Sequence, residues 1–121
     1  MAPKFVRKSF EQMDARGGGV VKLARKSLGV SAFGIQVFDF PPGASTPLHD
    51  ESPSGQEEVY VGLAGSGWVE VEGERVPLEA RTAVFVPPGV MRTTVAGPEG
   101  LSFLAVGAAP HPQSRANPKF D

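Results

Sequence analysis

Residues 43–65 read GASTPLHDESPSGQEEVYVGLAG, and this stretch is the most informative part of the chain. It is expected to bring one histidine and two of its carboxylates, His49, Glu51 and Glu58, towards one site, and these residues flank a segment rich in Ser, Pro and Gly. Such a composition is typical of a loop between two β-strands. An imidazole and two carboxylates on neighbouring strands suit a metal ion or a small polar ligand. The stretch therefore predicts a binding site.

Alternation along an extended chain indicates which side chains share a face. His49 and Glu51 are two residues apart, so both are expected to point to the same side. By the same rule Asp50 and Glu57 are expected to face away from the site.

The rest of the sequence indicates an all-β domain. Fifteen glycines and twelve prolines punctuate short segments rich in valine and aromatic residues. About eight short strands with no long helix favour a β-sandwich or a small barrel. Gly73 is expected to supply the positive φ of a tight hairpin over residues 71–75. The expected strands cover residues 20–24, 34–40, 57–63, 67–71, 75–77, 83–86, 92–96 and 101–106.

The N-terminal segment differs from the rest in charge. The first 26 residues hold seven of the twelve basic groups, whereas residues 39–79 hold nine acids and one base. Ser9–Gln12 has the form of a capping box and predicts one short helical turn over residues 10–15. No interleaving of aromatic and basic residues accompanies the charge, so we expect a basic edge strand docked on an acidic body, without a nucleic-acid or membrane partner.

Composition excludes several classes of protein. A chain of 121 residues is long enough for one hydrophobic core. It contains no cysteine, which rules out disulfides, thiol nucleophiles and cysteine-based metal sites. No apolar run approaches the roughly 20 residues that span a bilayer, and the N-terminus lacks the apolar core of a signal peptide. A cytoplasmic location is the expectation.

A second motif, PPGVMR at residues 87–92, completes a resemblance to the small single-domain cupins. The resemblance covers about residues 33–107 and implies a cupin-type double-stranded β-helix, a jelly-roll barrel. It also implies an N-terminal arm over 1–32 and an irregular tail over 108–121. The positions that match the two family motifs are Gly43, His49, Glu58, Gly65, Pro87, Pro88 and Gly89.

The departures from the family pattern concern the metal ligands. The resemblance implies a site of three histidines and one glutamate, but here Glu51 stands at the second histidine and Arg92 at the third. Arg81 and Ala96 replace the glycine and the asparagine of the second motif. A guanidinium has no acceptor atom and cannot ligate a metal, so we expect Arg92 to pair with Glu58 or Glu51.

These observations favour a cupin that binds a small anionic molecule, a carboxylate or a phosphate, without a metal. Arg92 would clamp the anion, and His49 or Glu58 would act as general acid or base. Apolar residues on both faces of several strands also predict a homodimer. The residues expected to line the ligand site with Arg92 are Phe38, Tyr60, Trp68, Phe85, Met91 and Phe103.

Two alternatives stay open. One is a metal-dependent enzyme of dioxygenase, isomerase or decarboxylase type, which would hold Mn, Fe, Ni or Zn through His49, Glu51 and Glu58. The other is an oligomerising domain without chemistry, whose internal charges serve only the structure. His111 lies in the Pro-rich tail and is expected to be an exposed residue.

Overall fold

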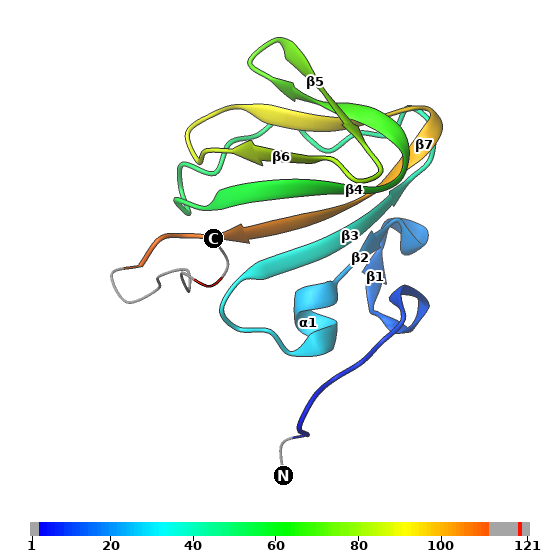
Figure 1. Cartoon of the computed structure of the whole chain (residues 1–121), viewed down its shortest axis with the longest axis vertical. Helices are drawn as coiled ribbons and strands as arrows, with labels where there is room; N and C mark the ends of the chain where they lie inside the picture. The colour runs from blue at the N-terminus through cyan, green and yellow to red at the C-terminus, as the bar shows by residue number, and fades with distance from the viewer. Residues whose placement is uncertain (1–2, 112–118, 120–121) are drawn as a thin grey trace.

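The computed structural model describes residues 3–111 and 119 and shows an all-β fold built on one antiparallel sheet. The order is β1-β2-β3-β7-β4-β5, with β6 paired to β4. Figure 1 shows this sheet folded over into two layers, which confirms the predicted jelly roll. The strands are β1 (Ala15–Arg16), β2 (Val21–Lys22), β3 (Gly34–Phe40), β4 (Glu57–Val71), β5 (Glu74–Glu79), β6 (Ala83–Val86) and β7 (Arg92–Ala108).

The long strands β4 and β7 run through both layers. The first part of β4 pairs with β6 and with the end of β7, and the second part pairs with β5 and with the start of β7. The sequence predicted two separate strands in each of these regions. The glycines instead form bulges, with register shifts at Gly62/Ala64 and Gly65/Gly67. A Cβ at Gly65 would lie 2.2 Å from the carbonyl oxygen of Gly100, so the bend requires glycine there.

The N-terminal arm contains three short helical elements. The predicted turn is present as η1 (Phe10–Gln12), and its capping box is formed. It is followed by η2 (Gly17–Gly19) and α1 (Ala24–Leu28). The predicted strand over 20–24 is shorter, because Ala24 begins α1, which ends at Gly29 with φ 79°.

Two apolar clusters hold the layers together. The larger one fills the barrel between the layers and contains Tyr60, Val69, Leu78 and Phe103. The smaller one consists of Met13, Ala24 and Val37 and packs α1 and the chain before β1 against β3. Burial of these side chains, at about 25 cal/mol per Å², therefore anchors the basic arm to the barrel.

The turn between β4 and β5 forms as predicted. Gly73 has φ 87°, and Glu72 before it has φ 49°, the two positive values that a type I′ hairpin needs. No helix among the described residues is long and apolar enough to cross a membrane. The predicted irregular tail lies mostly outside the described residues, although Ala108 still belongs to β7.

Candidate functional site

The two motif segments lie side by side and are joined by backbone hydrogen bonds. His49 N–H donates to the Arg92 carbonyl at 3.0 Å, and Arg92 N–H donates to the His49 carbonyl at 2.8 Å. Glu51 N–H donates to the Pro88 carbonyl at 2.8 Å. The first motif thus forms a short antiparallel ladder along the start of β7, which fixes the direction of its side chains.

Local structure orients both carboxylates. A turn follows Glu51, in which Gly55 N–H donates to the Glu51 carbonyl at 2.7 Å. Within this turn the Ser54 hydroxyl donates to Oε1 of Glu51 at 3.2 Å. Glu58 is the second residue of β4 and lies opposite Gly107 of β7. Because Gly107 has no side chain, the space beside Glu58 stays open.

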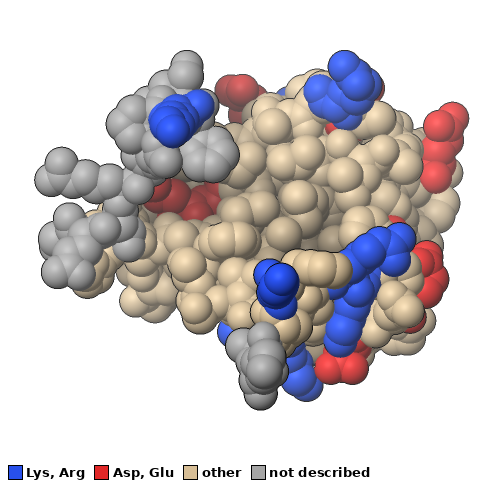
Figure 2. All heavy atoms as spheres, turned by 60° about the horizontal axis from the view of Figure 1, so that its bottom comes forward, with Lys and Arg blue, Asp and Glu red and all other residues tan. Residues whose placement is uncertain are grey.

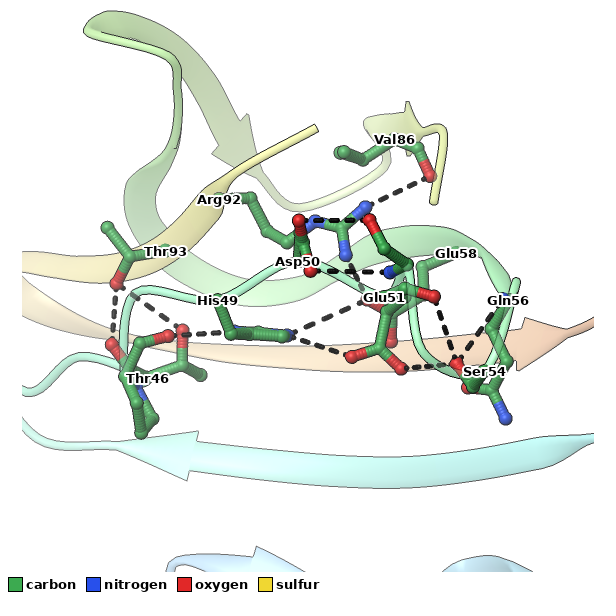
Figure 3. Close-up of polar contacts among 12 residues, drawn as sticks. Thr46, His49, Asp50, Glu51, Ser54, Gln56, Glu58, Val86, Arg92 and Thr93 are labelled. Carbon is green, nitrogen blue, oxygen red and sulfur yellow. Dashed lines mark hydrogen bonds and ion pairs between the residues drawn. The ribbon is translucent and has the colours of Figure 1, made fainter. Parts of the chain in front are cut away.

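The three predicted polar side chains converge (Figure 3). Nε2 of His49 lies 3.6 Å from Oε2 of Glu51 and 3.9 Å from Oε1 of Glu58. One ligand atom from each residue can be chosen so that all three lie within 4.8 Å of one another.

The tautomer of His49 bears on whether a cation fits. Its Nδ1 lies 2.8 Å from the Pro47 carbonyl, which only accepts, so Nδ1 carries a proton. Nε2, the nitrogen left without a proton in this tautomer of the neutral ring, lies near both carboxylates. A backbone bond at one nitrogen that leaves the other free is the usual arrangement of a metal-binding histidine. The residues present therefore fit a metal.

Two further groups contact Oε1 of Glu58, the same oxygen that lies near Nε2 of His49. Tyr60 Oη donates to Oε1 of Glu58 at 2.8 Å, and a terminal nitrogen of Arg92 lies 3.3 Å from the same oxygen. Burial raises the pKa of Tyr60 well above its usual value of 10.0, and the nearby Glu58 charge adds to the shift. Tyr60 therefore remains a hydrogen-bond donor at neutral pH.

Arg92 pairs with Glu58, as the sequence predicted, but it does not lie in the cleft. Its side chain is 0% exposed, and its second terminal nitrogen donates to the carbonyls of Val86 and Pro87. Among the described residues, Nε of Arg92 finds no hydrogen-bond acceptor. Arg92 is thus an internal counter-ion for Glu58, and the prediction that it clamps a ligand disagrees with this placement.

A cleft of about 400 Å³ opens in front of the carboxylates. Figure 2 shows the hollow, with acidic atoms inside it. The residues that line the cleft include the three converging residues and four residues of the N-terminal arm, Arg16, Leu23, Arg25 and Lys26. The lining residues are Arg16, Leu23, Arg25, Lys26, Gly34, Ile35, Gln36, His49, Glu51, Gln56, Glu58, Ala105 and Gly107.

None of the predicted apolar lining residues borders this cleft. Phe38 and Phe103 stack in the barrel at 4.6 Å, and Tyr60 packs beside them. Alternation on β3, β4 and β7 turns Phe38, Tyr60 and Phe103 toward the core. Phe85 and Met91 are 55% and 38% exposed.

Trp68 is another predicted lining residue that is absent from the cleft. Its ring lies under the guanidinium of Arg75, 4.3 Å from the centroid. Arg16, Arg25 and Lys26 line the cleft but are not among the site residues predicted from the sequence. The available signal was the excess of basic residues in the first 26 positions.

The jelly roll, with a histidine and two carboxylates that converge beside a cleft, is the arrangement expected of a cupin. Comparison with known proteins supports this class. Residues 36–107 match the sequence profile described as the cupin domain. The chain belongs to the cupin family. A cupin protein from Bacteroides fragilis superposes with a TM-score of 0.76 over 96% of this chain and 93% of that one, at 21% identity.

Two further relatives have functional names. A structure described as a predicted oxalate decarboxylase from Thermotoga maritima has a TM-score of 0.60 and 27% identity, covering 74% of this chain and 81% of that one. Dimethylsulfoniopropionate lyase DddW from Ruegeria pomeroyi is 38% identical over 69 residues. That match covers 57% of this chain but 43% of the relative, so the chain spans less than half of its length.

Proposed function

We propose that the protein binds one divalent metal ion through His49, Glu51 and Glu58 and takes up a small molecule in the adjoining cleft. The observation that supports this proposal most directly is the approach of Nε2 of His49 to both carboxylates, with Nδ1 already bound to a carbonyl. One imidazole and two carboxylates form an oxygen-rich set that suits Mn or Fe, with Ni and Zn as further candidates.

The buried position of Arg92 removes the main argument against a metal. The sequence favoured a metal-free site because an arginine in the same space would repel a dication. Arg92 instead contacts Glu58 and backbone carbonyls and does not border the cleft. It neutralises one of the two carboxylates through Oε1 of Glu58, which lowers the attraction for a dication.

When bound, the metal would supply Lewis acidity to an oxygen of the ligand. The chain's own residues hold and orient the three side chains that would bind the metal. Tyr60 and Arg92 hold Glu58 in place, Ser54 orients Glu51, and the Pro47 carbonyl fixes the imidazole of His49. The fixed orientation of each group lowers the cost of assembling the site.

Elemental analysis and calorimetry test the metal site. Protein purified without chelator is expected to contain about one Mn, Fe, Ni or Zn per chain, and apo-protein to bind Mn²⁺ with the same stoichiometry. His49→Ala should lose this binding, because it removes the nitrogen ligand. His111→Ala is the matched control, since His111 does not border the cleft. Wild-type protein that neither contains nor binds metal would contradict the proposal.

A second candidate function is lyase activity, and the match to DddW favours it. This relative is named for dimethylsulfoniopropionate, a small carboxylate of a size that a cleft of about 400 Å³ accepts. Consumption of that compound by this protein can be followed by NMR. Activity that a chelator abolishes would indicate a metal-dependent lyase. Activity insensitive to chelator would instead assign acid–base roles to His49 or Glu58.

We also propose a homodimer and a cytoplasmic location. The outer face of β4 and β6 presents Leu63 and Phe85, which are 40% and 55% exposed. A second copy covering this face would remove apolar surface from water. Light scattering after size exclusion tests the dimer, and Phe85→Asp should shift it toward monomer. A dimer that binds neither metal nor small molecule would support a purely oligomerising role.

A further inference from the structure

We infer that the N-terminal arm supplies the second half of the ligand site and selects molecules with an anionic group at the end remote from the metal. We call Arg16, Arg25 and Lys26 the basic wall, and His49, Glu51 and Glu58 the acidic wall. Both walls line one cleft. This inference rests on the proposed function, since the acidic wall is taken to hold the metal.

The size of the cleft sets the size of the ligand. Its volume of about 400 Å³ is at the low end of the range for small-molecule sites. Gly34 and Gly107 are register partners on β3 and β7, and both line the cleft. A Cβ at Gly107 would lie 3.2 Å from Cγ of Glu58, so a side chain there would crowd the acidic wall. The ligand is therefore expected to be a compact molecule.

The basic wall is not neutralised by the acidic wall. Among the described residues, no ion pair within 4.0 Å joins the two walls. Lys26 pairs with Asp14 at 3.6 Å, outside the cleft. Arg25 makes one long bond, 3.4 Å, to the Val30 carbonyl. Arg16 has no acidic partner in the described part of the chain.

Two guanidinium groups without acidic partners in one cleft predict an anionic ligand. Arginine presents paired N–H donors that match a carboxylate or a phosphate, which makes it better suited to such groups than lysine. An oxygen atom at the other end of the ligand would reach the metal. The ligand class is therefore a small molecule with an oxygen donor at one end and a carboxylate or phosphate at the other.

Calorimetry with defined probes tests this assignment. Mn²⁺ is titrated first into apo-protein, alone, so that the metal site is scored separately. Succinate, phosphoglycolate and the uncharged succinamide are then titrated into Mn²⁺-loaded protein. We expect one or both anions to bind and succinamide not to bind. A preference for succinate or for phosphoglycolate would identify carboxylate or phosphate as the recognised group.

Variants of the arm locate the binding. Arg16→Gln and Arg25→Gln should each weaken binding of the anion about tenfold, roughly 1.4 kcal/mol, and leave the affinity for Mn²⁺ within about twofold. Arg7→Gln removes the same charge from the same arm but outside the cleft, and it should have no effect. Because Arg16 and Arg25 are exposed, these variants should fold normally.

Several results would overturn the inference. The first is an anion affinity that is equal in wild type, Arg16→Gln and Arg25→Gln. The second is a wild-type protein that binds Mn²⁺ but neither anion. The third is tight binding of succinamide. If wild-type protein binds no Mn²⁺, the proposed function fails, and the titrations are repeated on metal-free protein. Anion binding that still depends on Arg16 and Arg25 would then support the basic wall, and its absence would overturn it.

Discussion

The segments 43–65 and 81–96 each carry one family motif and lie hydrogen-bonded to each other, yet they contribute opposite things to the site. The first places His49 and Glu58 where ligand and solvent reach them, with side chains 36% and 16% exposed. The second places Arg92 at the position paired with His49, 0% exposed. Position 92 thus keeps its backbone pairing with His49, whereas its side chain is a counter-ion and not the metal ligand of the family motif.

Burial explains the difference. A metal ligand must be reachable by an ion that arrives from solvent, whereas a counter-ion is most effective where water is excluded. In the low-dielectric interior the attraction between Arg92 and Glu58 is stronger, and loss of either partner costs more. The first segment should therefore govern binding and the second stability.

The largest effect is expected for Arg92→Ala. It removes a buried cation and leaves Glu58 without its partner, so the free energy of unfolding should fall by about 3 kcal/mol. Urea denaturation measures this change. The control is Arg75→Ala, whose side chain is 67% exposed beside Glu70, and which should cost about 1 kcal/mol or less. Equal losses in the two variants would mean that burial does not distinguish the two arginines.

Next in size is the contrast between the two carboxylates. Glu58→Gln removes the charge that faces Arg92 and should destabilise the protein by about 2 kcal/mol. Glu51→Gln changes a group that, among the described residues, is contacted by Ser54 and His49, so its effect on stability should stay near 0.5 kcal/mol. Both should weaken Mn²⁺ binding. Loss of stability without loss of Mn²⁺ affinity in Glu58→Gln would remove Glu58 from the metal site.

Arg92→His would give the second segment an imidazole, the type of metal ligand that His49 provides in the first. It removes the internal cation and adds an imidazole, so Mn²⁺ or Ni²⁺ should bind about tenfold more tightly than to wild type, roughly 1.4 kcal/mol. Arg92→Ala serves as the control because it gains no ligand. Unchanged affinity in Arg92→His, measured by calorimetric titration, would show that position 92 does not reach the His49–Glu58 site.

The smallest expected effect is the change of the free energy of unfolding at high pH. The pKa of Tyr60 is raised on folding, so its contribution to stability is complete below pH 10 and is lost as the pH rises further, because only the unfolded chain ionises there. At pH 10.5 the loss should be about 0.8 kcal/mol, and Tyr60→Phe should not show it. Phenolate absorbance of the folded protein at pH 10.5 would contradict this, since Tyr60 is the single tyrosine.

Sequence patterns were sufficient for the local elements. The bounds predicted for β3 and β6 agree with the structure, and the hairpin forms at Gly73. The convergence of His49, Glu51 and Glu58 was also predictable, because alternation and one loop decide it. These features depend on contacts between residues close in sequence or on a single strand pairing.

Features that depend on how distant segments close on each other were not predictable. Clusters of glycine around Gly65 and Gly100 read as strand ends, but in the folded sheet they are bends where two backbones approach closely. The burial of Arg92 follows from the carbonyls of Val86 and Pro87, which no pattern reveals. The basic wall arises because Ala24 packs against Val37, a tertiary contact that brings the arm to the cleft.

The arm is joined to the barrel by a very short ladder. β1 and β2 have two residues each, and β2 pairs with β3 at Val37 and Phe38, next to one bond from Asp39 N–H to the Val20 carbonyl. A ladder of this length should open locally at a lower free energy than the long pairing of β4 with β7. Amide hydrogen exchange would then be fast at residues 15–22 and slow across β4. A ligand that contacts both walls would bind only while the arm is closed, so opening of the arm would lower its apparent affinity. The bound ligand would in turn slow amide exchange at residues 15–22.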